Sequence, residues 1–243
     1  MSSLKDFIGW QFVQKTKFDR NTIQKIRPPL LHGSFNQKYK VSKLCFLPRP
    51  SKIDVPFSEV VSKRASCRTY IPRKISVQDL SNILWMGYGI REKKGNFYFG
   101  NAPSAGALYP LDIYVAIFHV ATLENGIYRY NAYQNALEMI KKGDFSRELI
   151  NGCLGQSFVG SGAFTALISA VFRRNMRKYG ERGVRYIFID AGHVVQNMIL
   201  TAESLSLGAC PVGAFFDNEL NEIIGLDGEE ETIIYLLSIG VRG

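Results

Sequence analysis

The fold of this chain is decided by one stretch of sequence, GVRYIFIDAGHVVQNMILTAESLSL, which runs from Gly183 to Leu207. Its apolar residues recur at steps of three and four, and they are Val184, Ile187, Phe188, Ala191, Val194, Val195, Met198, Ile199, Ala202 and Leu205. This spacing predicts a long helix with one broad buried face. The opposite face carries a polar stripe suited to a second contact surface, formed by Tyr186, Asp190, His193, Asn197 and Ser204.

Strands are predicted elsewhere in the chain. β-branched and aromatic residues favour a strand at 111–120 and a hairpin that joins 127–130 to 136–140. Two further apolar runs, at 166–172 and 231–242, are also typical of strands. Because strands and helices do not alternate regularly, the sequence predicts an α+β fold with a partly antiparallel sheet.

The chain has 243 residues, of which 46% are hydrophobic, and this is enough to bury a sizeable core in one domain. We expect residues 58–243 to form that domain. Residues 1–57 combine a helical start with several prolines, which prevent a long helix, so we expect them to wrap over the domain. Ser76 is placed to cap a short helix predicted at 77–90.

Several classes of protein and of site are disfavoured. Residues 1–10 do not resemble a secretory signal and the longest apolar stretch, 162–172, is too short for a membrane span, so we expect a cytoplasmic protein without a membrane partner. Four scattered cysteines and three scattered histidines offer no metal-ligand spacing, so we predict no metal. The net charge of +9 permits nucleic-acid binding, but no matching motif accompanies it, and we predict no nucleic-acid partner.

Two short motifs point to a nucleotide-like cofactor. The first, RASCR at 64–68, places two guanidinium groups and a hydroxyl within five residues, and these can hold a phosphate through charge-assisted hydrogen bonds. The second, APSAGALYP at 102–110, is rich in small residues whose backbone can approach a flat ring closely. Each motif alone is weak, because basic clusters are usually solvated surface and Pro/Gly loops are usually turns.

Four further segments strengthen this interpretation, namely KYGERGVRY at 178–186, DAGHVVQN at 190–197, LGACPVGAF at 207–215 and LDGEE at 226–230. With them, the chain resembles the nitroreductase superfamily from about Val60 to the C-terminus, and specifically its SagB-type dehydrogenase branch, which includes azoline oxidases. The resemblance implies an FMN cofactor and a nitroreductase-like mixed, largely antiparallel sheet flanked by helices. It also implies a homodimer with the long helix at its centre.

The resemblance assigns residues to the cofactor. The segment that binds the phosphate and ribityl chain matches Arg64, Ser66 and Arg68. The loop over the flavin ring, which the other protomer usually supplies, matches Pro103, Ser104 and Ala105. The backbone stretch beside the reactive edge matches Pro211, Val212, Gly213 and Ala214. A C-terminal cation on the phosphate matches Arg242. Taken alone, Gly213 is equally consistent with a turn and Arg242 with a solvated terminus.

Lys178 and Tyr179 match a pair that azoline oxidases of this branch use in catalysis. A lysine removes a proton from carbon only as the neutral amine, and the arginines around it in sequence would favour that form. The alternative is a fully solvated Lys178 at the edge of the long helix. His193 is expected to be structural, and Asp190 remains ambiguous.

Three functions remain open. The first is an FMN-dependent oxidoreductase that transfers a hydride between flavin and a small-molecule or modified-peptide substrate, with oxidation of peptide azolines to azoles as one example. The second is an NAD(P)H-dependent nitro- or quinone reductase, in which NAD(P)H would bind only transiently because no Rossmann motif is present. The third is a weakly active flavin-binding component of a biosynthetic complex. The Lys178–Tyr179 pair favours an active enzyme.

Overall fold

A computed structural model describes residues 3–18, 41–95 and 97–243 of the chain. The helices are α1 (Ile8–Lys15), α2 (Phe57–Lys63), α3 (Val77–Tyr88), α4 (Ser146–Gly152), α5 (Phe158–Ser161), α6 (Phe172–Tyr179), α7 (Gly183–Ser204) and α8 (Asp217–Ile224). Short 3₁₀ turns occur at η1 (Leu4–Asp6), η3 (Ala105–Ala107) and η4 (Gly180–Arg182). The strands are β1 (Lys43–Phe46), β2 (Tyr70–Ile71), β3 (Ile90–Lys94), β4 (Phe97–Gly100), β5 (Leu111–Ile117), β6 (Gly126–Asn131), β7 (Ala136–Lys142), β8 (Phe164–Val171), β9 (Leu207–Val212) and β10 (Glu231–Arg242).

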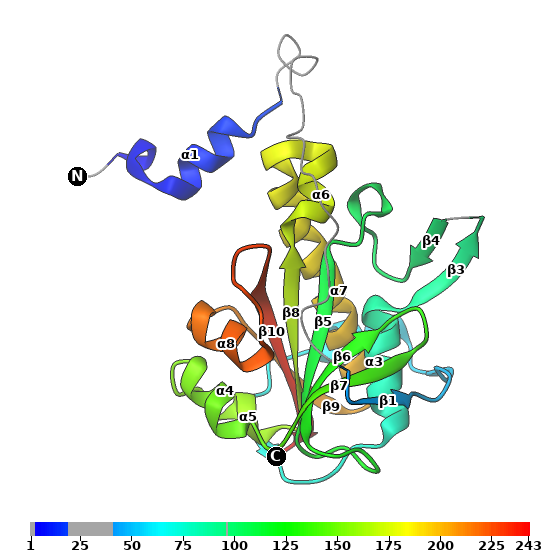
Figure 1. Cartoon of the computed structure of the whole chain (residues 1–243). Helices are drawn as coiled ribbons and strands as arrows, with labels where there is room; N and C mark the ends of the chain where they lie inside the picture. Colours follow the sequence, from blue (N-terminus) through cyan, green and yellow to red (C-terminus); the bar gives the residue numbers. More distant parts are fainter. Residues whose placement is uncertain (1–2, 19–40, 96) are drawn as a thin grey trace.

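Eight of these strands form one sheet in the order β1-β7-β6-β5-β8-β10-β2, with β9 paired to β10 beside this path. Every ladder between its named strands is antiparallel. The strands β3 and β4 form a separate ribbon that projects from the body (Figure 1). The α+β prediction and the predicted hairpin, now β6 and β7, are confirmed.

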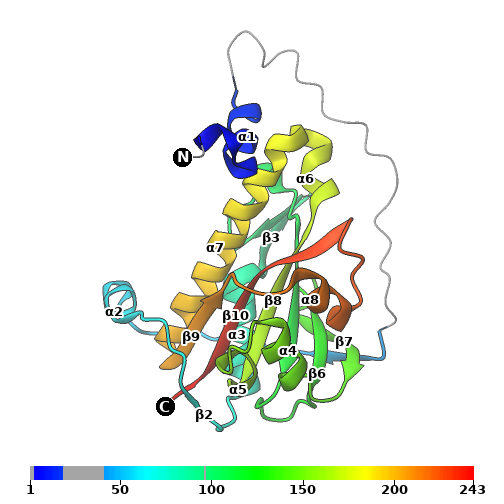
Figure 2. The same cartoon turned by 90° about the vertical axis from the view of Figure 1, so that its left-hand side faces the viewer.

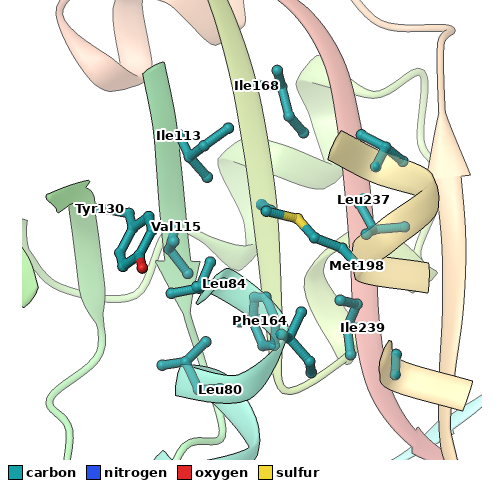
Figure 3. Close-up of a cluster of buried hydrophobic side chains, with 14 of the residues drawn as sticks. Leu80, Leu84, Ile113, Val115, Tyr130, Phe164, Ile168, Met198, Leu237 and Ile239 are labelled. Atoms are coloured by element: carbon teal, nitrogen blue, oxygen red, sulfur yellow. The ribbon is translucent and has the colours of Figure 1, made fainter. Parts of the chain in front are cut away.

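Helices cover both faces of the sheet. Successive side chains of a strand point to opposite faces, so each face of the sheet presents apolar residues that the helices cover. Along β5, Ile113 and Val115 face a core cluster shared with α3 and α7, whereas Tyr114 and Ala116 face a second cluster shared with α4, α5 and α8. Figures 1 and 2 show these two layers. In the first cluster, side chains from the strands β5, β6, β8 and β10 pack with side chains of α3 and α7, among them Met198 (Figure 3).

The predicted long helix is α7, and its first residue is the expected one. Ile187, Val194 and Met198 are fully buried against the sheet, and each contributes about 1.5–3 kcal/mol by leaving water. A carbon added at Gly87 of α3 would lie 2.4 Å from Met198 Cγ, so only glycine lets α3 approach α7 this closely. The prediction of a buried face is wrong for one residue of the single chain. Phe188 is 51% exposed and is not covered by the sheet.

The polar stripe of α7 is divided between contacts and solvent. Asp190 is buried, and the Asn197 side chain donates a hydrogen bond to the Met86 carbonyl at 3.3 Å, so these two residues pack against neighbouring segments. His193 is exposed. The predicted helix at 77–90 is α3, where Ser76 and Asp79 form a reciprocal capping box.

The described residues of the N-terminal segment contact the body at several places, and residues 19–40 lie outside the described residues. Residues 48–51 bind α3, where the Pro48 carbonyl accepts a hydrogen bond from Ser81 at 2.6 Å and the Ser51 N–H donates one to the Asn82 side chain at 2.9 Å. Strand β1 pairs with β7 at the sheet edge. Near α1, the Thr16 carbonyl accepts a hydrogen bond from Arg182 at 2.7 Å, and the Thr16 hydroxyl accepts one from Arg185 at 2.7 Å. Within the described ranges, no helix has the length and apolarity that crossing a bilayer requires.

Candidate active site

The basic motif lies along strand β9. Residue Ser66 forms a parallel bridge with Ala209, and the Cys67 N–H donates a hydrogen bond to the Ala209 carbonyl at 2.9 Å. Arg64 ends helix α2, is half-buried, and leads directly into this bridge. The chain therefore folds the motif against the first half of β9, with Ser66 and Arg68 exposed.

The side chains of this motif are available to a ligand. Arg64 and Ser66 make no side-chain hydrogen bond or ion pair with any described residue, and the Arg68 guanidinium only lies 5.8 Å from the Phe158 ring centroid. Two guanidinium groups and a hydroxyl, all donors and none engaged by an acceptor, are the donor set that a phosphate needs. The residues present therefore fit the phosphate of a flavin mononucleotide.

Arg242 lies beside the motif but is already paired. Its guanidinium binds the Glu203 carboxylate of α7 and donates to the Leu207 carbonyl at 3.3 Å. The Arg242 side chain also passes so close to Gly208 that a carbon added there would lie 3.1 Å from Arg242 Cγ. In the single chain this cation is thus held next to the basic motif and paired with Glu203.

The other end of β9 presents open backbone. Gly213 and Ala214 follow the last paired residue, Val212, and both are exposed. A carbon added at Gly213 would meet no atom within 4 Å, which leaves room for a ligand to approach. Ala209 and Gly213 are four residues apart, or about 13 Å along a strand, so β9 can carry phosphate donors at one end and ring contacts at the other.

The predicted ring loop is anchored on α7 by Asp190. The buried carboxylate accepts a hydrogen bond from the Ser104 hydroxyl at 2.7 Å and one from the Ala105 N–H at 3.3 Å. Burial raises the pKa of Asp190, and the two hydrogen bonds oppose this rise by stabilising the ionised carboxylate. Asp190 is therefore a loop anchor, a role that its position in the helix did not reveal.

Lys178 and Tyr179 meet the same loop at Gly106. A carbon added at Gly106 would lie 2.4 Å from the Tyr179 hydroxyl and 2.8 Å from Lys178 Nζ, and the positive φ of 64° also favours glycine. The Lys178 amine lies 5.2 Å from the Tyr179 ring centroid. Lys178 is exposed, as the solvated alternative expects, but it stands against the loop at the end of α6.

Four of the five arginines near Lys178 in sequence bind other segments, whereas Arg177 has no hydrogen-bond or ion-pair partner among the described residues. Arg173 binds Glu230 and Arg174 binds Asp112, so both are neutralised by carboxylates. Arg182 and Arg185 hold Thr16 of the N-terminal segment. The carboxylates that bind Arg173 and Arg174 thus reduce the predicted crowding of positive charge around the amine.

A single chain gathers the predicted residues into two groups. The basic motif, Arg242 and the stretch 211–214 lie along β9, whereas the loop 103–105 lies with Lys178 and Tyr179. The helix α7 connects the groups, because Asp190 holds the loop and Glu203, thirteen residues later, holds Arg242. This is a separation of about 20 Å along the helix. The described residues hold no group of three His, Cys, Asp or Glu side chains that could bind a metal.

The chain is similar in sequence to a family of known proteins. A sequence model of the nitroreductase family matches residues 61–241. The chain belongs to the nitroreductase family. It is 37% identical to a candidate nitroreductase of Methanocaldococcus jannaschii over 191 residues, which cover 79% of this chain and 93% of that protein.

The chain is also similar, more distantly, to proteins of microcin B17 processing. It is 26% identical to the microcin B17-processing protein McbC of Escherichia coli over 133 residues, 51% of this chain and 48% of that protein. The chain thus spans about half of McbC. A chain in the structure of the E. coli microcin synthetase McbBCD complex with truncated pro-MccB17 shares the fold, with a TM-score of 0.66 and 18% identity over 96% of this chain and 86% of that one.

Proposed function

We propose that this nitroreductase-family chain is an FMN-dependent oxidoreductase that oxidises azoline rings, as small molecules or within modified peptides, to azoles. The observation that carries the proposal is the contact of Lys178 and Tyr179 with Gly106 of the ring loop. In our proposal the loop covers the flavin, so that the amine and the phenol beside it would act on a substrate at the ring. The similarity to a microcin-processing protein supports the substrate class.

The chain's residues divide the work. Arg64, Ser66 and Arg68 would hold the FMN phosphate, and the open backbone at 211–214 would lie along the ring. Bound FMN would supply the acceptor for the hydride that leaves the azoline carbon. The Lys178 amine would take the proton that leaves the same ring, so that one hydride and one proton together account for the oxidation. Tyr179 would orient the substrate beside the amine.

A second copy of the chain completes this site in our proposal. The loop 103–105 is anchored on Asp190, whereas Arg242, beside the basic motif, is bound to Glu203, about 20 Å farther along α7. Phe188 and Ile189 of α7 are 51% and 53% exposed, an apolar area suited to the centre of a homodimer. Across that interface, each chain would supply its loop to the flavin of the other. Residues 58–243 would then form the FMN-binding domain, with 1–57 as an accessory segment.

A nitro- or quinone reductase that receives electrons from transient NAD(P)H is the second candidate. It is favoured by the 37% identity to the candidate nitroreductase of M. jannaschii. Both candidates require bound FMN. They differ in the compound that reduces it, which is an azoline in the first and NAD(P)H in the second.

Anaerobic flavin bleaching distinguishes these candidates. We expect a 2-aryl thiazoline to bleach the oxidised-flavin absorbance of the purified protein and to be converted to the thiazole, with a much slower response to NADPH. The physical reason is that the Lys178 amine assists removal of a carbon-bound proton, a step that hydride donation by NADPH does not need. Rapid bleaching by NADPH with no thiazole formed would assign the protein to the reductase class instead.

A further inference from the structure

A cavity of about 550 Å³ opens between the β3–β4 ribbon, the ring loop and α6. This volume is within the range of small-molecule sites. Its walls carry five tyrosines, namely Tyr88, Tyr98, Tyr109, Tyr130 and Tyr133. It lies outside the two groups of residues that the proposed flavin site uses, and it adjoins the second of them.

Three of the tyrosine hydroxyls are occupied by the protein itself. Tyr88 donates to the Leu111 carbonyl at 2.7 Å, Tyr109 to the Tyr98 carbonyl at 2.9 Å, and Tyr130 to the Asn135 side chain at 2.9 Å. What remains for a ligand is largely ring surface. The rings of Tyr88 and Tyr109 meet edge to face, with their centroids 6.4 Å apart. Such walls favour a flat, apolar body.

Two of the three arginines that line the cavity are held by carboxylates. Three arginines and one aspartate line it, and Asp112 accepts from Arg129 at 2.8 Å and from Arg174 at 2.8 Å. Arg129 also binds Glu138 at 3.2 Å, so both of these arginines are paired with carboxylates. The remaining cation is Arg177, which is exposed and has no hydrogen-bond or ion-pair partner among residues 3–18, 41–95 and 97–243.

The wall nearest the ring loop has an unusual backbone. Ala107 and Tyr109 have φ values of 52° and 46°, a left-handed conformation that non-glycine residues rarely adopt. Ser104 holds it, since its carbonyl accepts from the Ala107 N–H at 3.0 Å and its hydroxyl from the Tyr109 N–H at 3.0 Å. Strained backbone that the surroundings fix in this way is typical of ligand sites.

We propose that this cavity binds a ligand that joins a flat ring to a carboxylate, with the ring against the tyrosines and the carboxylate on Arg177. A guanidinium can bind a carboxylate through two parallel hydrogen bonds, which gives orientation as well as affinity. The cavity adjoins the reaction site on two elements. Ala107 follows Gly106 in the loop, and Lys178 follows Arg177 in α6. This last step rests on the proposed function: the ligand is then the carboxylate-bearing ring of the substrate or product.

Calorimetric titration of the purified protein tests the cavity directly. The probes are 2-phenylthiazole-4-carboxylate and its carboxamide, which has nearly the same shape without the charge. We expect the carboxylate to bind at least tenfold more tightly, and Arg177→Gln to abolish this preference. The control Arg147→Gln, which removes an exposed arginine on α4, should preserve it. Equal affinity for both probes, or an unchanged preference in Arg177→Gln, would overturn the proposal.

Two further variants separate this proposal from the proposed function. Tyr98→Ala should weaken both probes alike, since it removes ring surface and no charge, whereas unchanged binding of both would contradict the aromatic wall. Lys178→Ala should retain the preference for the carboxylate while losing flavin reduction. If Lys178→Ala loses turnover but wild type shows no preference for the carboxylate, the cavity proposal is wrong and the proposed function stands. If the preference is present but thiazolines never bleach the flavin, the cavity proposal stands alone.

Discussion

Replacing Arg64 and Arg68 together with alanine is expected to weaken FMN binding by a factor of about 10² to 10⁴. Each guanidinium would lose charge-assisted hydrogen bonds worth about 1.5–3 kcal/mol, and about 1.4 kcal/mol corresponds to a factor of ten in affinity. The fold should remain intact, because neither side chain bonds to another described residue. Fluorescence titration of flavin-free protein with FMN measures the change, and circular dichroism checks the fold.

A matched pair of substitutions controls for charge. Arg73 and Lys74 are exposed cations of the same basic region, between β2 and α3, and they lie outside the bridge that Ser66 makes to β9. The double variant Arg73→Ala/Lys74→Ala removes the same charge and should change FMN affinity little. If the two double variants lose the same affinity, the motif acts only through its long-range field and is not the phosphate site.

Lys178→Ala is expected to lower the rate of thiazoline-dependent flavin reduction by a factor of about 10² or more, with FMN still bound. General-base assistance by a positioned side chain contributes rate factors of about 10² to 10⁴. FMN should still bind, because the proposed phosphate donors lie in the basic motif beside β9 and are unchanged in this variant. Stopped-flow absorbance under anaerobic conditions gives the rate.

Two companion variants separate the role of the amine from its charge. Lys178→Arg keeps the positive charge but cannot become neutral, so it should be as slow as the alanine variant if the amine is the base. Tyr179→Phe removes only the hydroxyl and should have the smaller effect if this group orients the substrate. A Lys178→Ala variant that reduces its flavin at the wild-type rate would show that the pair is not catalytic.

Much of the fold could be predicted because its elements carry local signals. The hairpin of β6 and β7 follows from apolar and aromatic residues around a turn, and α3 follows from its capping box. The long helix α7 follows from its periodicity. Strand β9 was not predicted, because its glycine and proline are unfavourable in strands and its conformation depends on pairing with β10.

The helix α6 shows a second limit. The apolar run at 166–172 indicates one strand, but β8 ends at Val171 and α6 begins at the next residue, Phe172. Nothing in the run marks this change. The N-cap of α6 is Val171, whose apolar side chain makes no capping hydrogen bond. The alternative interpretation therefore placed Lys178 at the edge of the long helix, whereas a separate turn, η4, divides it from α7.

The candidate site was predictable in its residue types and not in its geometry. The resemblance named both groups of residues, but the bond from Ser104 to Asp190 joins residues 86 positions apart, and no local pattern reports such a contact. The same holds for Gly106, whose closeness to Lys178 and Tyr179 is visible only in three dimensions. The unpartnered charge of Arg177 likewise depends on which arginines Asp112 has already bound.

Native mass spectrometry of the purified protein tests the central claim most directly, because it reports the cofactor and the assembly in one spectrum. We expect a yellow protein whose mass is that of two chains and two FMN molecules, since the phosphate donors on β9 and the ring loop of a second copy are both needed to enclose each flavin. A colourless monomer that takes up no FMN, even when the cofactor is added in excess, would contradict the account.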